Sequence, residues 1–436
     1  MIGIADTELM REIYGIPNNF AKSSLYDHFL CYGERPIFAT LAASDHRRKR
    51  RLSTSFYQKP SIQNPEVEAF VRDRLSALFK QINATLECCC PQDSINIYPL
   101  FNWFAFDNIT RLLYGTSHGS YTIERDCWER EILLKLKQAS IWGPFRFNFP
   151  KFFGSRLSKT LLRNGYADAL SALGDLASWN SIKLDQVCEH GYSETGRSLF
   201  QHLLTSTDKD PEALSQRYIS SEVLDNLNAA QETVSVALIY VAYRLSRHPD
   251  WQDRLFAELA KLPREDDGYP SFADIDGMPL LEAFVNEVLR LHPGTSGRHE
   301  RIVHQGGIHC GDVFIPADVI VSVSTIALHH NEFAFPSADV FDPNRWLGGS
   351  YEEYRAMCRC FAPFGYGSRI CIGRFFAELQ IKILTAGLCL KYHLRIGHDL
   401  IVMEKTMRQT GTMDAVPVGL RCDLILAPKG IRTLEG

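Results

Sequence analysis

A single cysteine lies among glycines in the stretch FGYGSRICIG, which runs from Phe364 to Gly373. A thiolate is a soft, strongly donating metal ligand that needs positive surroundings to stay deprotonated. Gly367 and Gly373 have no Cβ atom, so the backbone can approach a flat partner closely. Backbone N–H groups of the helix expected after Cys371 would point toward its sulfur, Arg369 could pair with an anionic group, and Phe364 offers an apolar face. These residues describe a cradle for a planar, anionic metal cofactor with one axial thiolate, which is haem.

A structural role is the alternative for Cys371. A glycine-flanked, buried cysteine is more often a small core residue than a metal ligand. The chemistry of the loop alone leaves both interpretations open.

A long helix with few charges is expected from about Pro211 to Arg247. Its centre, EVLDNLNAAQETVSVALIYVAYRL, is nearly free of charge apart from Glu222, Asp225 and Glu232. Such a helix must be buried on almost all sides. A carboxylate in that setting needs a partner or a task.

The surrounding elements are also mostly helical in the first part of the chain. Apolar residues recur at i, i+3, i+4 and i+7 in 45–58, 64–86 and 100–115, which predicts three helices. Alternation with Gly, Asp and Pro predicts short strands in 306–328, 392–397 and 420–428. We expect a mainly α fold with a minor antiparallel β component, in a single domain over residues 1–436.

The composition excludes several classes of protein. Net charge is −4 with a pI near 6.4, so no global basic character points to nucleic acid. The longest apolar runs, such as residues 234–243, are shorter than the roughly 20 residues that span a bilayer, and the first residues do not form a signal peptide. The 12 cysteines have no regular spacing, which argues against a disulfide scaffold and favours a reducing compartment.

The cysteine stretch matches a family signature at every defined position. It resembles F-x-x-G-x-R-x-C-x-G, the haem-binding motif of the cytochrome P-450 (haem-thiolate monooxygenase) family. The resemblance implies the cytochrome P-450 fold and a haem b cofactor. It also implies that Cys371 is the proximal iron ligand and that Arg369 contacts a haem propionate.

Two further stretches extend the resemblance to a structural triad. In NEVLRLHP, Glu287 and Arg290 match the family's E-x-x-R pair and share one helix face. In FDPNRWL, Arg345 matches the arginine that completes the triad, while Asn344 replaces the frequent glutamate. The implied role of the triad is structural support of the cysteine loop.

The long helix contains AAQETV, which resembles the family's oxygen-activation motif. Glu232 and Thr233 occupy its acid and alcohol positions, which implies a proton relay to iron-bound dioxygen in a dry site. The alternative is a threonine bonded to its own helix backbone and a carboxylate satisfied by a neighbour. Ala230 replaces the usual glycine.

Three basic residues resemble further haem contacts of the family. His46 and Arg50, at i and i+4 in DHRRKRRL, could both reach a propionate. Arg301 lies approximately at the position of another family arginine that contacts a haem propionate. Arg298 is the alternative for that position. The alternative for the basic helix is a solvated face, which would attract an acidic electron donor.

The resemblance also implies partners and a location. Electrons would come from NADPH through a separate flavoprotein reductase, and cytochrome b5 is a second candidate donor. The enzyme would be a monomer at the cytoplasmic side of the endoplasmic reticulum. The substrates would be O2 and a small, largely apolar organic molecule, in specialised metabolism of a fungal type. The aromatic stretch 140–153 would line its entrance or belong to the core. The usual N-terminal anchor, hinge and first elements of microsomal members are expected to be absent.

Two other functions remain open on the sequence. A haem-thiolate protein without oxygenase activity, or an inactive truncated relative, would keep Cys371 and lose the relay. A zinc-binding interaction protein would use Cys358, Cys360, Cys371 and a histidine, although no second paired motif follows.

Overall fold

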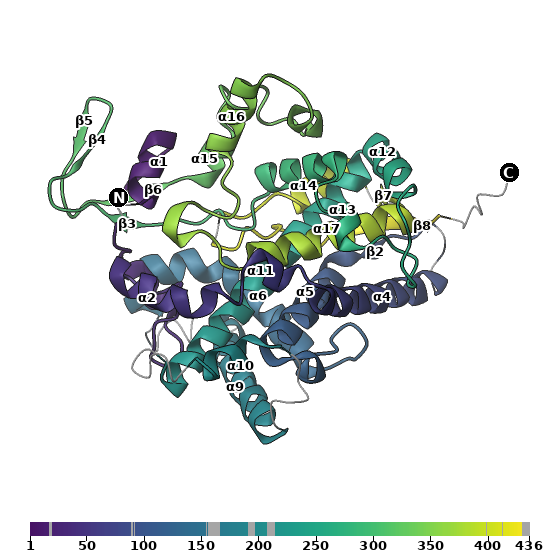
Figure 1. Ribbon diagram of the computed structural model, residues 1–436, viewed down its shortest axis with the longest axis horizontal. Helices are drawn as coiled ribbons and strands as arrows, with labels where there is room; N and C mark the ends of the chain where they lie inside the picture. Colours follow the sequence, from purple (N-terminus) through teal and green to yellow (C-terminus); the bar gives the residue numbers. More distant parts are fainter. Residues whose placement is uncertain are drawn as a thin grey trace.

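The computed structural model describes residues 1–16, 20–88, 90, 92–153, 155, 166–190, 197–206, 214–397, 399–411 and 413–429. The long helix α11 (Gln216–Arg247) crosses the middle of the molecule (Figure 1). It begins after Ser215, whose hydroxyl accepts a hydrogen bond from the backbone N–H of Tyr218. Helices α5, α9, α14 and α17 pack against it and bury most of its surface.

The other α-helices of the described residues are mostly short or of medium length. They are α1 (Thr7–Tyr14), α2 (Ala43–Thr54), α3 (Lys59–Ile62), α4 (Pro65–Glu87), α5 (Ile97–Tyr114), α6 (Trp128–Asn148), α7 (Pro150–Phe153), α9 (Tyr166–His190), α10 (Leu199–Leu204), α12 (Pro249–Leu259), α13 (Phe272–Ile275), α14 (Pro279–Leu291), α15 (Thr325–His329), α16 (Tyr351–Cys360), α17 (Arg374–Lys391) and α18 (Leu400–Thr406). Short 3-10 helices are η1 (Ser24–Phe29), η2 (Thr116–His118), η5 (Pro343–Trp346) and η6 (Gly367–Arg369).

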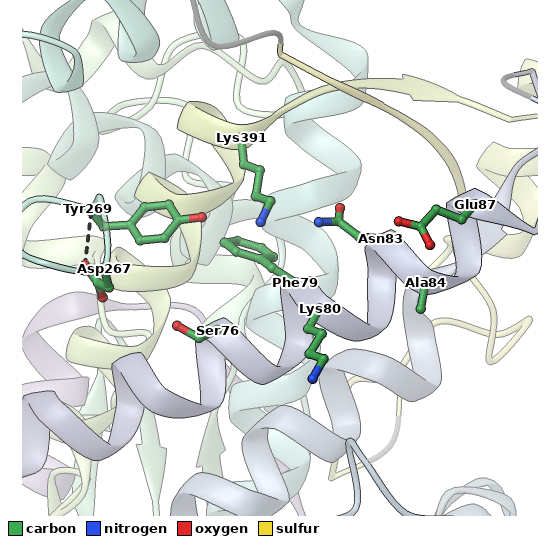
Figure 2. Close-up of a pocket in the computed structure, with 9 residues that line it drawn as sticks. All are labelled: Ser76, Phe79, Lys80, Asn83, Ala84, Glu87, Asp267, Tyr269 and Lys391. Carbon is green, nitrogen blue, oxygen red and sulfur yellow. Dashed lines mark hydrogen bonds between the residues drawn. The ribbon is translucent and has the colours of Figure 1, made fainter.

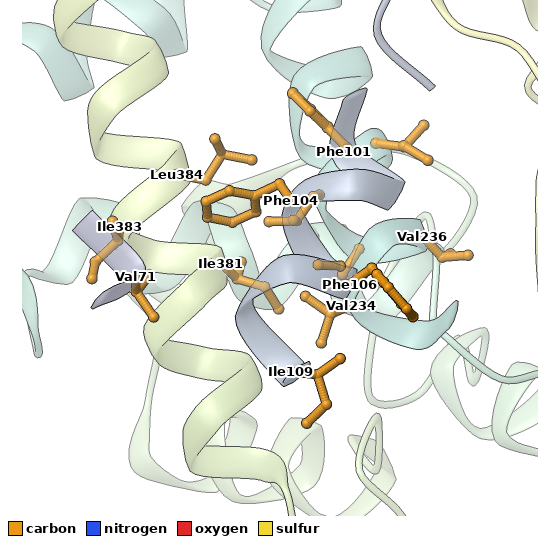
Figure 3. Close-up of a cluster of buried hydrophobic side chains, with 14 of the residues drawn as sticks. Val71, Phe101, Phe104, Phe106, Ile109, Val234, Val236, Ile381, Ile383 and Leu384 are labelled. Atoms are coloured by element: carbon orange, nitrogen blue, oxygen red, sulfur yellow. The ribbon is translucent and has the colours of Figure 1, made fainter. Parts of the chain in front are cut away.

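The main hydrophobic core lies where α5, α11 and α17 meet (Figure 3). Phe101, Phe104 and Phe106 of α5 are fully buried there, together with Val236 of α11 and Leu384 of α17. Burying each such side chain stabilises the fold by about 1.5–3 kcal/mol. This core holds α11, which carries Glu232 and Thr233, against α17, which follows the cysteine loop.

Three small sheets accompany the helices in the described part of the chain. Strands β1 (Ile2–Ile4), β6 (Ile320–Val323) and β3 (Arg301–Ile302) form one sheet in the order β1-β6-β3. The others contain β2 (Ile95–Asn96), β8 (Asp423–Pro428) and β7 (Tyr392–Ile396), and the hairpin β4 (Ile308–Cys310) with β5 (Val313–Ile315). The pairings are antiparallel, except that β1 runs parallel to β6.

The predicted helices correspond to α2, α4, α5 and α11. Helix α2 ends at Thr54 rather than at residue 58, and in the turn that follows the backbone N–H groups of Phe56 and Tyr57 both donate to the carbonyl of Ser53. The predicted strand region 306–328 gives β4, β5 and β6, but its end forms α15, which the side chain of Ser324 caps. Within the described part of the chain, the helices are too short or too polar to span a bilayer. The single-domain organisation stays a prediction.

Candidate functional site

Cys371 lies in the turn between η6 and α17. Its backbone N–H donates to the carbonyl of Phe364 at 2.8 Å, which closes the loop on itself. The backbone N–H of Gly373, the residue before α17, lies near the sulfur and favours its negative charge. Burial raises the pKa of the Cys371 thiol, whereas this N–H and the guanidinium of Arg50 act to lower it. The thiolate therefore has the backbone donor and the nearby cation that its chemistry requires.

The glycines of the loop have two different surroundings. Gly367 has φ of 72°, and a Cβ atom there would lie 2.0 Å from the carbonyl oxygen of Tyr14, so α1 presses directly on this turn. At Gly365 and Gly373 a Cβ atom would meet nothing within 4 Å. The loop is thus closed on the side of α1 and open beside the cysteine.

Arg369 reaches from the loop toward the start of α2. Its guanidinium donates to the carbonyl oxygens of Thr40 at 2.7 Å and Leu41 at 2.8 Å. Its Nε is buried and has no hydrogen-bond partner among the described residues. Burial first, and then Arg301, lower the pKa of Arg369 to about 9.

Other basic side chains gather around Arg369. Burial, followed by Arg369 and Arg50, lowers the pKa of His46 to about 3. Burial, followed by Arg301 and Arg369, lowers the pKa of Lys22 well below its usual value. We call Lys22, His46, Arg50, Arg301 and Arg369 the basic cluster. Its charged members repel one another, and among the described residues no acidic side chain forms an ion pair with any member.

The basic cluster and Cys371 fit a haem group. Several cations around one place, without acidic partners, are costly unless an anion joins them. The two propionates of haem are such anions, and an open glycine turn beside a thiolate suits the flat ring. The donor set and the unpartnered Arg369 Nε therefore agree with this cofactor.

The structure distinguishes the two rival arginines. Arg301 is buried and stacks over Tyr14, with its centre 4.7 Å from the ring. Arg298 is more exposed and lies 3.5 Å from Glu300. Lys22 was not predicted, because a lone lysine in a loop has no spacing that marks it.

Thr233 lies on an accessible face of α11. Its hydroxyl donates to the carbonyl of Ala229 at 2.9 Å. This bond to the threonine's own helix backbone is the alternative to a relay role that the sequence analysis left open. Ala229 is exposed although most of α11 is buried. A Cβ atom on Gly294 would lie 3.1 Å from the Cβ of Thr233, so residues after α14 approach this face.

Glu232 and Thr233 point to different partners. The carboxylate of Glu232 forms a buried ion pair with Lys137 of α6, and Gln231 donates to the same oxygen at 2.9 Å. Asp414 lies near this pair: burial first, and then Glu232, raise its pKa to about 7, and Lys137 opposes this rise. The structure therefore does not bring the side chains of the predicted relay together.

Glu287, Arg290 and Arg345 lie together behind the cysteine loop. Arg290 donates to both carboxylate oxygens of Glu287, at 2.9 and 2.8 Å, and both side chains are fully buried. Arg345 Nε lies 3.1 Å from Glu287 Oε1, and the indole of Trp346 donates to Oε2 at 3.0 Å. This buried ion pair, in which two N–H groups of the guanidinium donate to the two carboxylate oxygens, is stronger than the exposed pair that i, i+3 spacing alone suggests.

His329 connects this triad to the loop. One ring nitrogen lies 2.9 Å from the carbonyl of Arg290, and the other accepts a hydrogen bond from the backbone N–H of Ala362, at 2.9 Å. Burial lowers the pKa of His329 to about 3, so the ring is neutral and can donate and accept at once. No motif in the sequence marks this residue.

Other predicted features lie apart from the cluster. Phe149 is exposed, and the side chains of Trp142, Phe145 and Phe147 lie outside the described residues. The zinc hypothesis requires a group of three or more His, Cys, Asp or Glu side chains that could hold a metal ion. Within the described ranges no such group is found. Figure 2 shows a pocket of about 440 Å³ between α4 and Lys391, whose lining includes none of the predicted site residues.

The sequence matches the cytochrome P450 family over residues 1–413. It is 36% identical to the cytochrome P450 monooxygenase FGM1 of Gibberella zeae, over 97% of this chain and 83% of that protein. It is 26% identical to the tryprostatin B 6-hydroxylase of Aspergillus fumigatus, over 91% of this chain and 68% of that protein. The cytochrome P450 monooxygenase azaI of Aspergillus niger is 24% identical, over 99% of this chain and 91% of that protein. The chain belongs to the cytochrome P450 family of haem-thiolate monooxygenases.

Proposed function

We propose that this P450 monooxygenase binds haem b through Cys371 and inserts one oxygen atom of O2 into a small, largely apolar organic molecule. The observation that carries the assignment is the combination of Cys371 with the basic cluster. The thiol has a backbone N–H and an arginine near it, and within the described ranges the five members of the basic cluster form no ion pair with an acidic side chain. When bound, haem with a thiolate ligand supplies the cleavage of the O–O bond.

The residues around this site would have three roles: they would pair with the propionates, contact the ring and hold the cysteine loop. Lys22, Arg50, Arg301 and Arg369 would pair with the propionates and set the orientation of the ring. Phe364 would pack against the ring, and Gly367 and Gly373 would let the backbone approach it. Glu287, Arg290 and Arg345 would hold the loop through His329, because that histidine bonds both α14 and the backbone of Ala362.

Thr233 is our candidate for proton delivery. Its hydroxyl lies on the accessible face of α11 and can donate one proton while accepting another. Glu232 remains the proposed acid of the relay, with its carboxylate held by Lys137 in this structure. Both roles are inferred from their family positions together with the accessibility of Thr233.

The setting of the reaction is proposed from the family and its relatives. A separate NADPH-dependent flavoprotein reductase would supply two electrons, and the solvated arginines of α2 offer it a basic surface. One relative is named as a hydroxylase of tryprostatin B, a specialised metabolite. This similarity favours a specialised pathway for this chain. We also propose a single-domain monomer at the cytoplasmic face of the endoplasmic reticulum.

The test is a reduced, carbon-monoxide difference spectrum of the purified protein. We expect the thiolate-type Soret band in the wild type and in the control Cys358→Ser, which changes an exposed cysteine. The band should be lost in Cys371→Ser. A band that survives in Cys371→Ser, or zinc without iron in metal analysis of the wild type, would contradict the proposal.

A further inference from the structure

The pocket in Figure 2 brings together three parts of the chain outside the cysteine loop. One wall is α4, a second is the loop that holds Asp267 and Tyr269, and a third is Lys391 at the end of α17. Its volume of about 440 Å³ is that of a small-molecule site. Phe79 of α4 lies at its centre and is almost fully buried, with its ring centre 5.8 Å from that of Tyr269.

Lys391 places a half-buried cation in this pocket. Its ammonium lies 5.1 Å from the centre of the Phe79 ring and 6.0 Å from that of Tyr392. Among the described residues, no side chain forms an ion pair with it. Burial lowers the pKa of Lys391, and no described carboxylate opposes this change. The aromatic rings therefore hold the cation in place without neutralising it.

The two carboxylates that line the pocket do not neutralise Lys391. Asp267 is bound by Arg72, whose Nε donates to it at 2.9 Å while a second guanidinium nitrogen donates to its other oxygen. The backbone N–H of Tyr269 also donates to Asp267, at 3.1 Å. Glu87 is exposed to water at the last residue of α4. The charge of Lys391 thus remains available to a ligand.

Two further hydrogen-bond donors face the same place. The hydroxyl of Tyr392 donates to Oδ1 of Asn83 at 2.7 Å, which leaves the NH2 group of Asn83 free to donate. Burial raises the pKa of Tyr269 to about 12, so its hydroxyl keeps its proton. Figure 2 shows this hydroxyl, the NH2 group of Asn83 and the ammonium of Lys391 pointing toward one another beside Phe79.

We propose that this pocket binds a small organic anion, whose carboxylate accepts hydrogen bonds from Lys391, Asn83 and Tyr269. The inference goes beyond the proposed function, because the pocket lies apart from the cysteine loop and its donors need no haem. A carboxylate has two oxygens with four lone-pair sites, so it can accept from all three donors at once.

The charge and size of the ligand follow from the lining. A neutral ligand would accept the hydrogen bonds but leave the cation of Lys391 unpaired, and a cationic ligand would be repelled by it. The pocket is much larger than a carboxylate group. Ala84, the ring of Tyr269 and the apolar stem of Lys80 line the remaining space, which favours a carboxylate carried on a flat hydrocarbon ring.

The test compares naphthalene-2-carboxylate with naphthalene-2-carboxamide, which has nearly the same shape but no charge. Their dissociation constants are measured by calorimetry on the holoprotein at neutral pH. Saturating 1-phenylimidazole, which coordinates haem iron, keeps both probes away from the cofactor. We expect the wild type to bind the carboxylate about tenfold more tightly than the carboxamide, because its hydrogen bonds are charge-assisted.

Two variants remove the attraction in different ways. Lys391→Met keeps the length of the side chain and removes its charge. Asn83→Asp keeps the acceptor for the Tyr392 hydroxyl but places a carboxylate beside Lys391, in the position of the ligand. Both variants should reduce the preference for the carboxylate to within about threefold, since each removes a charge-assisted hydrogen bond. Tyr269→Phe, which removes only a hydroxyl, should keep part of the preference.

Lys429→Met is the matched control. Lys429 is also half-buried over an aromatic ring, 4.0 Å from the centre of Phe256, but it does not line the pocket. This variant should keep the full preference for the carboxylate. Equal binding of the two probes by the wild type, or an unchanged preference in either Lys391→Met or Asn83→Asp, would overturn the inference.

Discussion

At the scale of single residues, the pair of Lys137 and Glu232 shows how a charge is kept in the core. Both side chains are almost completely buried, at 2% and 5% exposure. One oxygen of Glu232 has no hydrogen-bond partner among the described residues. Removing two charges from water costs several kcal/mol per ion, and their attraction repays it only while both are present. The neutralisation of Glu232 thus depends on one residue of α6.

We expect Lys137→Met to lower the free energy of unfolding by about 3–5 kcal/mol, because it leaves Glu232 buried without a cation. Denaturant unfolding of the holoprotein measures this loss. The double variant Lys137→Met with Glu232→Gln should recover at least half of it, since no uncompensated charge remains.

The matched control for this experiment is Lys135→Met on the same helix. Lys135 is only partly buried, so its replacement should change stability by no more than about 0.5 kcal/mol. Equal stability of the Lys137→Met and Lys135→Met proteins would show that the ion pair does not matter.

The sequence predicts site residues where a motif fixes their spacing. Cys371, Arg369, Glu287 and Arg290 each stand at a set distance from a neighbour of defined type, so the pattern is visible in one dimension. Lys22, Lys137 and His329 reach their positions only through tertiary packing. Nothing in their neighbouring residues marks them, because lysine and histidine are common on any helix or loop.

At the scale of elements, the contact between α1 and η6 decides how the cysteine loop is held. Gly367 lies against the carbonyl of Tyr14, the last residue of α1, with no room for a side chain. Gly365 has a similar positive φ of 76° but open space around it. The two glycines therefore separate the cost of backbone strain from the cost of a steric clash.

We predict that Gly367→Ala lowers haem content and melting temperature far more than Gly365→Ala. Both variants pay about 1–2 kcal/mol for a left-handed alanine. Only Gly367→Ala must also push α1 away from η6, because its Cβ would overlap the Tyr14 carbonyl. Haem per protein chain and thermal melting are the measurements. Similar losses in the two variants would mean that α1 does not support the loop.

Helices were more predictable than strands for a physical reason. A helix buries its apolar side through residues three and four apart, so α2, α4 and α5 can be seen in local periodicity. The parallel pairing of β1 with β6 depends on residues that are remote in the chain, such as Ile2 and Val321. No local pattern records such a pairing.

At the scale of the whole molecule, the basic cluster joins distant parts of the chain. Lys22 precedes η1, His46 and Arg50 lie on α2, Arg301 is in β3 and Arg369 is in η6. An anion at their centre would remove the repulsion among all of these segments at once. The bound cofactor should therefore order the N-terminal part of the fold as well as the cysteine loop.

Hydrogen exchange with two forms of the cofactor tests this expectation. Haem should protect residues 20–50, 299–302 and 364–374 relative to the apoprotein. Haem dimethyl ester, which has no propionate charges, should protect 364–374 but leave 20–50 and 299–302 much less protected. Helix α12, which has no residue in the cluster, serves as the internal reference. Equal protection by both forms would show that the cluster does not hold the propionates.

The pairing of β1 with β6 has a consequence for how the chain is made. Ile2 and its neighbours leave the ribosome long before their partners near Val321. At about 5–20 residues per second, the wait is on the order of half a minute. The segment around Lys22, which bridges to Arg301, shares this delay. During synthesis this apolar strand has an open edge, so chaperone binding to nascent chains should be strongest before residue 321 emerges.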